Sequence, residues 1–318
     1  MPTNHHNPCR YDGPSIFHIG YIKTGTTFLQ NQVFSRSELG LGLAGGEESR
    51  ATLINELVLK DGYDFDPSAA GCRLAALEEP SRALGLVPIW SDETLLGNVI
   101  ERRYDGQTSA ARLLALPGPK KVLITIREQR SFALSAYREY IKQGGRNTLD
   151  QFIGTGREPA SFTPILRTDF LCYDRAINFY RAALGKDGVL VLPSELLSRA
   201  PETFAWHLGA FLERDLSDLP VERTENKGRA ALTLPVARRL NALTLVNPLS
   251  PKPTLSRRIA RKLVVWMDRF TPAALNSPVE QRYRHQISQR YSGVFLSSNA
   301  VTQDATPVPL ADLGYEIA

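Results

Sequence analysis

Hydrophobic positions fall into short dense runs separated by longer stretches with helical spacing, a pattern typical of a parallel β-sheet with crossover helices. The dense runs predict four strands, at residues 15–19, 86–90, 121–126 and 188–192. Pro88 has no N–H to donate to a neighbouring strand, so we expect the second run to be an edge strand or to end irregularly. The pattern as a whole predicts an α/β fold with a central parallel sheet.

Helical spacing between and after these runs predicts the remaining elements. We expect one domain, with an α/β core at 12–232 and a helical C-terminal extension at 233–318 packed on it, because no strand-like run follows Pro220. The expected helices are at 26–34, 131–143, 169–184, 195–212, 234–245, 255–270 and 279–292, with two short helices and a turn within 48–85.

Composition narrows the class of protein. With 318 residues, of which 42% are hydrophobic and 22% charged, the chain is unlike disordered, collagen-like or disulfide-scaffold proteins. The net charge of +5 is too small for a protein that coats nucleic acid, so no nucleic-acid partner is expected. Three cysteines without a CxxC pair, no apolar leader and no apolar run near the roughly 20 residues of a spanning helix favour a reduced, cytoplasmic protein.

A loop that suits an anion follows the first predicted strand. Residues 20–27 read GYIKTGTT, with Gly20 and Gly25 at the G-x-x-x-x-G spacing of a Walker A loop. Thr26 stands where that motif has its lysine, and Lys23 lies inside the loop instead. Backbone N–H groups of such a turn and of a helix N-terminus cradle phosphate-like anions. The alternative is a strand–turn–helix whose glycines and threonines are incidental.

Two segments carry a resemblance to a known family. The stretch IGYIKTGTTFLQ resembles the 5′-phosphosulfate loop of sulfotransferases that use 3′-phosphoadenosine 5′-phosphosulfate (PAPS). Arg127 and Ser135 resemble that family's 3′-phosphate motif, an arginine that closes a strand and a serine eight residues later on a helix. The resemblance extends over about residues 15–230 and implies a P-loop-NTPase-like three-layer fold with PAPS as donor. The donor-binding residues that it implies are Lys23, Thr24, Gly25, Thr26, Thr27, Arg127 and Ser135.

A third, weaker similarity lies after Pro220. Lys227, Gly228 and Arg229 resemble the family's basic loop that folds over the 3′ end of the nucleotide. A solvated charged loop is the alternative.

The expected chemistry needs no metal ion. Sulfuryl transfer, like phosphoryl transfer, builds charge on the leaving oxygen, and Lys23 together with backbone N–H groups would stabilise that charge. The strand at 121–126 ends in Arg127 and not in an acid that would hold Mg²⁺, so no metal is expected.

The acceptor hydroxyl needs a base, and Glu93 is the first candidate. It lies in the segment SDETL after the second strand, at the sheet edge where ligands bind in open α/β folds. The segment resembles that of bacterial carbohydrate sulfotransferases, which implies a glycan or glycolipid acceptor; a small-molecule acceptor stays open. Asp92 or a histidine is the alternative base, although His18 on the first strand is expected to be a core residue. Glu93 in the first turn of a helix, with no catalytic role, also stays open.

Two other functions remain: a P-loop small-molecule kinase and a nucleotide-binding protein without catalytic activity. The lysine at position 23 instead of 26, together with Arg127 and Ser135, counts against the kinase. An absent base would favour the inactive protein.

The predicted helix at 255–270 carries most of the excess charge. Five cations and one acid give it a net charge of +4, and its apolar residues fall on one face. A peripheral contact with the inner face of a membrane is one interpretation. A packed helix with a solvated basic face is the other.

Overall fold

The computed structural model describes residues 13–44, 47–219, 230–243 and 254–317. Its centre is a five-stranded, all-parallel sheet with strand order β2-β3-β1-β4-β5. This confirms the predicted α/β fold with a central parallel sheet. The strands are β1 (Ser15–His18), β2 (Leu41–Leu43), β3 (Val87–Ser91), β4 (Lys120–Ile126) and β5 (Val189–Pro193).

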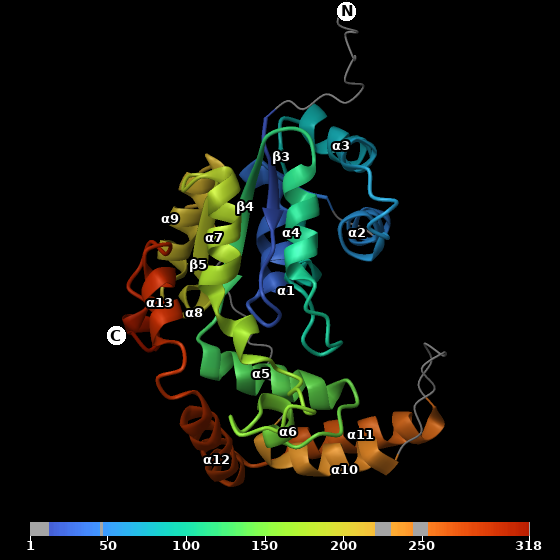
Figure 1. Cartoon of the computed structure of the whole chain (residues 1–318), viewed down its shortest axis with the longest axis vertical. Coiled ribbons are helices and arrows are strands. Elements are labelled where there is room, and N and C mark those ends of the chain that lie inside the picture. The colour runs from blue at the N-terminus through green and yellow to red at the C-terminus, as the bar shows by residue number, and fades with distance from the viewer. Residues whose placement is uncertain (1–12, 45–46, 220–229, 244–253, 318) are drawn as a thin grey trace, which may run out of the picture.

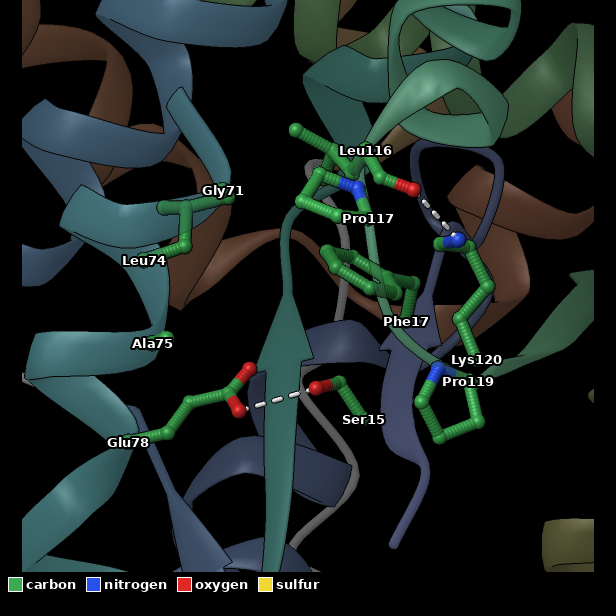
Figure 2. Close-up of a pocket in the computed structure, with 10 residues that line it drawn as sticks. All are labelled: Ser15, Phe17, Gly71, Leu74, Ala75, Glu78, Leu116, Pro117, Pro119 and Lys120. Carbon is green, nitrogen blue, oxygen red and sulfur yellow. Dashed lines mark hydrogen bonds between the residues drawn. The ribbon is translucent and has the colours of Figure 1, made fainter. Parts of the chain in front are cut away.

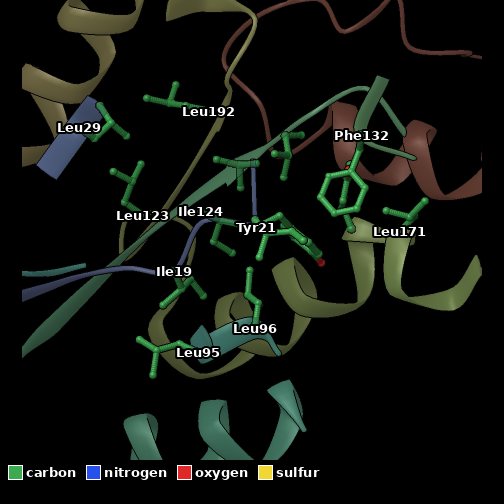
Figure 3. Packing of buried hydrophobic residues seen from close by; sticks show 14 of the residues in the cluster. Ile19, Tyr21, Leu29, Leu95, Leu96, Leu123, Ile124, Phe132, Leu171 and Leu192 are labelled. Atoms are coloured by element: carbon green, nitrogen blue, oxygen red, sulfur yellow. The ribbon is translucent and has the colours of Figure 1, made fainter. Parts of the chain in front are cut away.

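Helices cover both faces of the sheet, because the central strands are buried on both sides (Figure 1). Helices α4 (Gly106–Ala115) and α7 (Tyr173–Leu184) pack side by side on one face. Helices α1 (Thr26–Leu29) and α9 (Pro201–Leu212) lie on the other. Figure 3 shows leucines from α1, β4 and β5 converging on one hydrophobic core: Leu29, Leu123 and Leu192.

β2 was not predicted from the sequence, and its presence makes the edge-strand alternative for Pro88 wrong. β2 pairs with β3, so β3 is an internal strand and not an edge strand. The ladder between β1 and β3 begins at Ile16 and Ile89, one residue after Pro88, so no bond in it needs the missing N–H. β2 has only three residues, one of them a glycine, which is too short for its pattern to be distinctive.

Most predicted helices are present, with shifted ends. The predicted helix at 195–212 is split at Ala200 into α8 (Leu196–Arg199) and α9, since Pro201 begins a new helix. A π-helical segment, Gln30–Phe34, continues α1. The other helices are α2 (Glu47–Ile54), α3 (Pro67–Ala83), α5 (Gln129–Lys142), α6 (Leu149–Ile153), α10 (Leu234–Leu243), α11 (Leu255–Phe270), α12 (Ala273–Tyr291) and α13 (Leu296–Gln303).

The C-terminal helices contact the α/β core through α5 and, in the case of α13, also through α7. Arg138 on α5 pairs with Glu280 on α12 at 2.8 Å. Gln129 at the start of α5 donates to Asn299 on α13 at 2.5 Å. Asn241 on α10 donates to backbone carbonyls at the end of α5, and in Figure 1 α10 and α11 lie along α5 and α6.

Candidate active site

Four strands direct their following residues to one edge of the sheet. His18 pairs with Ser91 of β3 and with Leu123 of β4, and β5 continues the row. The segments that leave this carboxyl edge are 92–93 after β3, 19–27 after β1, 127–128 after β4 and 194–195 after β5. Ligands of open α/β sheets bind at this edge, where the connections diverge on either side of the central strand.

The loop at 20–27 is held tightly against β4. A Cβ added to Gly20 would lie 2.2 Å from Thr125 Oγ1, so only glycine fits there. Thr24 Oγ1 donates to the Tyr21 carbonyl at 2.5 Å and lies 2.8 Å from Thr125 Oγ1. Lys23, with φ of 65°, adopts the left-handed conformation that non-glycine residues rarely adopt. The loop is therefore held in one conformation, and the left-handed backbone at Lys23 destabilises it.

Thr26 has a buried hydroxyl without a hydrogen-bond partner among the described residues, at the start of α1. Its side chain is 6% exposed. The first N–H groups of a helix also lack acceptors within that helix. Thr27 beside it is exposed. Buried unpaired hydroxyls are costly, so this one calls for a ligand or water.

Lys23 is held loosely by a glutamate that the sequence did not single out. Its Nζ lies 3.4 Å from Glu139 Oε2, and its side chain is 39% exposed. Burial alone would raise the pKa of Glu139, but hydrogen bonding by Gln143 and the charges of Lys23 and Lys142 hold that pKa below its ordinary value. Glu139 lies four residues after Ser135 on α5, so helical spacing was the signal available for it.

Arg127 joins the two motifs. One of its guanidinium nitrogens, Nη1, donates to Ser135 Oγ at 3.3 Å and to the Lys23 carbonyl at 3.0 Å. Burial lowers the pKa of Arg127, an effect that nearby acids such as Glu195 oppose. The geometry thus brings Lys23 together with Arg127 and Ser135, which follow it by about 100 residues in the sequence.

Glu93 is a half-buried carboxyl directly after β3. Burial raises its pKa, with the negative charge of Asp92 adding and the charges of Arg50 and Lys23 opposing. No side chain in the described ranges donates a hydrogen bond to it. Asp92, by contrast, caps the next turn by accepting from the Thr94 N–H at 2.8 Å and pairs with Arg50 at 2.7 Å. The lone pairs of Asp92 are occupied, so Glu93 is the better candidate base.

His18 is a core residue, as predicted. Its Nδ1 lies 2.7 Å from Ser91 Oγ, and its Nε2 lies 3.0 Å from Thr125 Oγ1. Burial lowers its pKa to about 3, so the ring is neutral and hydrogen-bonded on both sides at ordinary pH. These contacts leave it no free nitrogen to act as a base.

Glu195 is a second acid that the sequence did not single out. It follows β5, accepts from the Glu128 N–H at 3.0 Å and lies 3.4 Å from the Tyr315 hydroxyl. Burial raises its pKa, and the charge of Arg127 opposes that shift. Through Tyr315, the C-terminal extension reaches the turn that carries Arg127.

A cavity of about 360 Å³ adjoins this edge between α4 and α7. Tyr21 of the loop and Leu96, three residues after Glu93, connect it to the site. Aromatic rings line much of it, and Arg167 and Asp169 form an ion pair in its wall. The Tyr180 hydroxyl, buried in the same wall, has no hydrogen-bond partner in the described ranges.

The predicted basic loop, Lys227, Gly228 and Arg229, lies outside the described residues. Within the described ranges, no group of three or more His, Cys, Asp or Glu is placed to hold a metal ion, and no helix is long and apolar enough to cross a membrane. Cys172 is a free thiol, but Cys72 is disulfide-bonded, so the expectation that all cysteines are reduced is wrong.

Comparison with known proteins finds likeness among solved structures. No protein-family model matches the chain, and no curated protein matches it. Among solved structures, it is similar to a sulfotransferase from Alicyclobacillus acidocaldarius, with a TM-score of 0.46 and 17% sequence identity over 83% of this chain and 99% of that one. A likeness at this level does not establish a function.

Proposed function

We propose that this protein is a PAPS-dependent sulfotransferase that sulfates a hydroxyl of a carbohydrate, glycolipid or small molecule. One observation carries the proposal: Arg127 Nη1 reaches both Ser135 and the carbonyl of Lys23. The two segments that resemble PAPS-binding motifs therefore lie side by side at one sheet edge.

The donor would lie along that edge. The N–H groups at the start of α1 and the unpaired Thr26 hydroxyl would take the 5′-phosphosulfate. Arg127 and Ser135 would take the 3′-phosphate, to which a guanidinium offers a planar fork of donors. Thr24 acts through the loop, since its hydroxyl is bonded to the backbone of Tyr21. Lys227, Gly228 and Arg229 stay a prediction.

Transfer would proceed in line. The acceptor oxygen forms a bond to sulfur while the bond from sulfur to the bridging phosphate oxygen breaks. Glu93 accepts the proton of the acceptor hydroxyl, and its raised pKa makes it a stronger base than an ordinary carboxylate. Lys23 leaves its 3.4 Å contact with Glu139 and stabilises the charge on the departing phosphate oxygen.

The aromatic cavity is the candidate acceptor site. Tyr104 and Phe170 in its wall offer ring faces of the kind on which sugars and other flat ligands stack. A Tyr104→Ala change should raise KM for the acceptor and leave donor affinity unchanged.

The kinase and the inactive nucleotide-binding protein are the rival functions. The pairing of Arg127 with Ser135 and the absence of a lysine at position 26 disfavour the kinase. The Glu93 carboxyl, which has a raised pKa, disfavours the inactive protein.

A cytoplasmic location stays a prediction.

Thermal unfolding with adenosine 3′,5′-bisphosphate and with ATP-Mg²⁺ tests the proposal. A ligand at a hundredfold excess over its Kd stabilises the native state by about 2.7 kcal/mol. We expect the bisphosphate to raise Tm and the rise to be lost in Arg127→Ala. A rise with ATP-Mg²⁺ alone would support the kinase. If the wild type binds the donor but transfers sulfate to no acceptor, the inactive nucleotide-binding protein would be supported.

A further inference from the structure

Helix α11 is attached to the protein along one side only. Val264 is buried there, and Asp268 accepts hydrogen bonds from the Ala230 N–H and from the Thr233 hydroxyl. Helix α11 also packs against α10. Val264 and Asp268 are four residues apart, so with 3.6 residues per turn they lie on the same side of the helix.

The apolar face of α11 is not the packed face. Its residues recur at spacings of three and four and are 45% to 73% exposed: Leu255, Ile259, Leu263, Trp266 and Phe270. The alternative in which this face packs into the protein and only the cations are solvated is therefore wrong. Leu243 on α10 and Leu275 on α12 are also exposed, at 82% and 59%. Five large exposed apolar side chains on one face of α11 mark a surface that contacts something other than water.

A band of cations borders this apolar stripe. Arg258, Arg261, Lys262 and Arg269 are exposed, and helical spacing places them between the stripe and the packed side. None of the four forms an ion pair among the described residues. The one acid of the helix, Asp268, is engaged on the packed side. The exposed surface of α11 thus carries the apolar stripe on one half and the four cations, with the exposed Val265 among them, on the other.

We propose that α11 docks on an anionic lipid surface, with its apolar stripe between the acyl chains and its cations at the headgroups. An apolar stripe that contains tryptophan and adjoins a basic band is the pattern of helices that lie in a membrane interface. A second copy of the chain fits less well, because a symmetric contact would bring two basic bands together. A nucleic acid would leave the five apolar side chains without a partner.

The place of α11 in the fold determines which end of the molecule would meet the lipid. In Figure 1, α11 lies below α5 and α6, at the end of the molecule to which β1 and β4 point. Docking would therefore place the lipid at the same end of the molecule as the carboxyl edge of the sheet. The proposed docking of α11 does not depend on the proposed function, because it rests only on the exposed residues of this helix.

Co-sedimentation of the full chain with vesicles tests the proposal. We expect binding to phosphatidylcholine vesicles that contain phosphatidylserine, little binding to phosphatidylcholine alone, and a loss of binding as salt rises. The combined change Arg258→Gln, Arg261→Gln and Lys262→Gln should weaken partitioning by about fivefold per cation. Trp266→Ala should weaken it as well, whereas Trp206→Ala, at an exposed tryptophan on α9, should not.

Three results would overturn the proposal. One is equal binding to neutral and anionic vesicles. Another is unchanged binding by the charge variant, provided that its Tm matches wild type. The third is a dimer in sedimentation velocity that Trp266→Ala abolishes while vesicles are not bound, which would assign the stripe to a second copy.

Discussion

Polar side chains at the two ends of the sheet differ in whether they have hydrogen-bond partners within the protein. At the amino edge, Figure 2 shows Glu78 of α3 beside Ser15 of β1, around a hollow of only about 10 Å³. The Glu78 carboxylate accepts from Ser15 Oγ at 2.8 Å, from Arg82 at 2.7 Å and from the Trp90 indole at 2.6 Å. The ammonium of Lys120 likewise bonds two backbone carbonyls. These groups hold the fold together and are not available to a ligand.

At the carboxyl edge, several polar side chains lack a close hydrogen-bond partner among the described residues. Thr26 Oγ1 is buried and unpaired, Glu93 has a raised pKa, and Lys23 is strained and held at 3.4 Å. Each of these arrangements costs stability in the free protein. The contrast indicates that the amino edge serves stability and the carboxyl edge serves binding, and mutations at the two edges should separate the two properties.

The largest effect is expected for Lys23→Met. Loss of a donor that stabilises developing charge typically lowers kcat by about 10²–10³-fold. Sulfate transfer should fall by that factor, measured at saturating PAPS, while Tm changes little. Lys142→Met is the matched control, because Lys142 is the other cation on Glu139. Equal losses in the two variants would show that the charge of Glu139, and not Lys23, matters.

Glu78→Ala should act on stability alone. It removes the acceptor of the Trp90 and Ser15 donors and one of the acceptors of Arg82, which should lower the free energy of unfolding by about 3 kcal/mol. Denaturant unfolding measures the loss, and activity per folded molecule should be unchanged. Glu79→Ala, at the exposed neighbour, should be nearly neutral. A Glu78 variant that is fully stable but inactive would reverse the roles of the two edges.

Glu93→Gln should lower kcat by about a hundredfold, since general bases contribute about 10²–10⁴-fold. Its stability effect depends on pH. The folded-state pKa of Glu93 is raised, so stability is lost as pH rises from the ordinary glutamate pKa up to the raised one. The variant should therefore have a higher Tm than wild type at neutral pH and an equal Tm well below the ordinary glutamate pKa. A lower Tm at neutral pH would show that the carboxylate has a stabilising partner.

Lys23→Gly should stabilise the protein by about 1 kcal/mol while abolishing most activity. The residue at this position has a φ of 65°, a conformation that costs a non-glycine residue about 1–2 kcal/mol. Unfolding in urea checks the gain. Destabilisation by glycine would mean that the Lys23 side chain stabilises the loop by more than the backbone strain costs.

The smallest effect is expected for Ser135→Ala. The loss of one hydroxyl from the 3′-phosphate site should raise KM for PAPS by about fivefold, the equivalent of one hydrogen bond, and leave kcat unchanged. Ser131→Ala, one turn earlier on α5, is the control. A fall in kcat without a change in KM would place Ser135 closer to the reacting atoms.

Local patterns predicted the parts of the site that depend on a strand and the loop after it. Lys23 and Arg127 each follow a strand that is buried on both faces, so hydrophobic runs located both of them. Glu139 and Glu195 were missed, because their roles depend on contacts between segments far apart in the chain. The exposed stripe of α11 was also beyond prediction, since periodicity shows that a helix has an apolar face but not whether that face is covered.

Amide hydrogen exchange of the full chain, with and without saturating adenosine 3′,5′-bisphosphate, tests the contrast between the edges most directly. The account predicts slower exchange in peptides that cover residues 20–27 and 127–135, and unchanged exchange at 71–78 and 116–120. Protection at the amino edge, or none at the carboxyl edge, would contradict it.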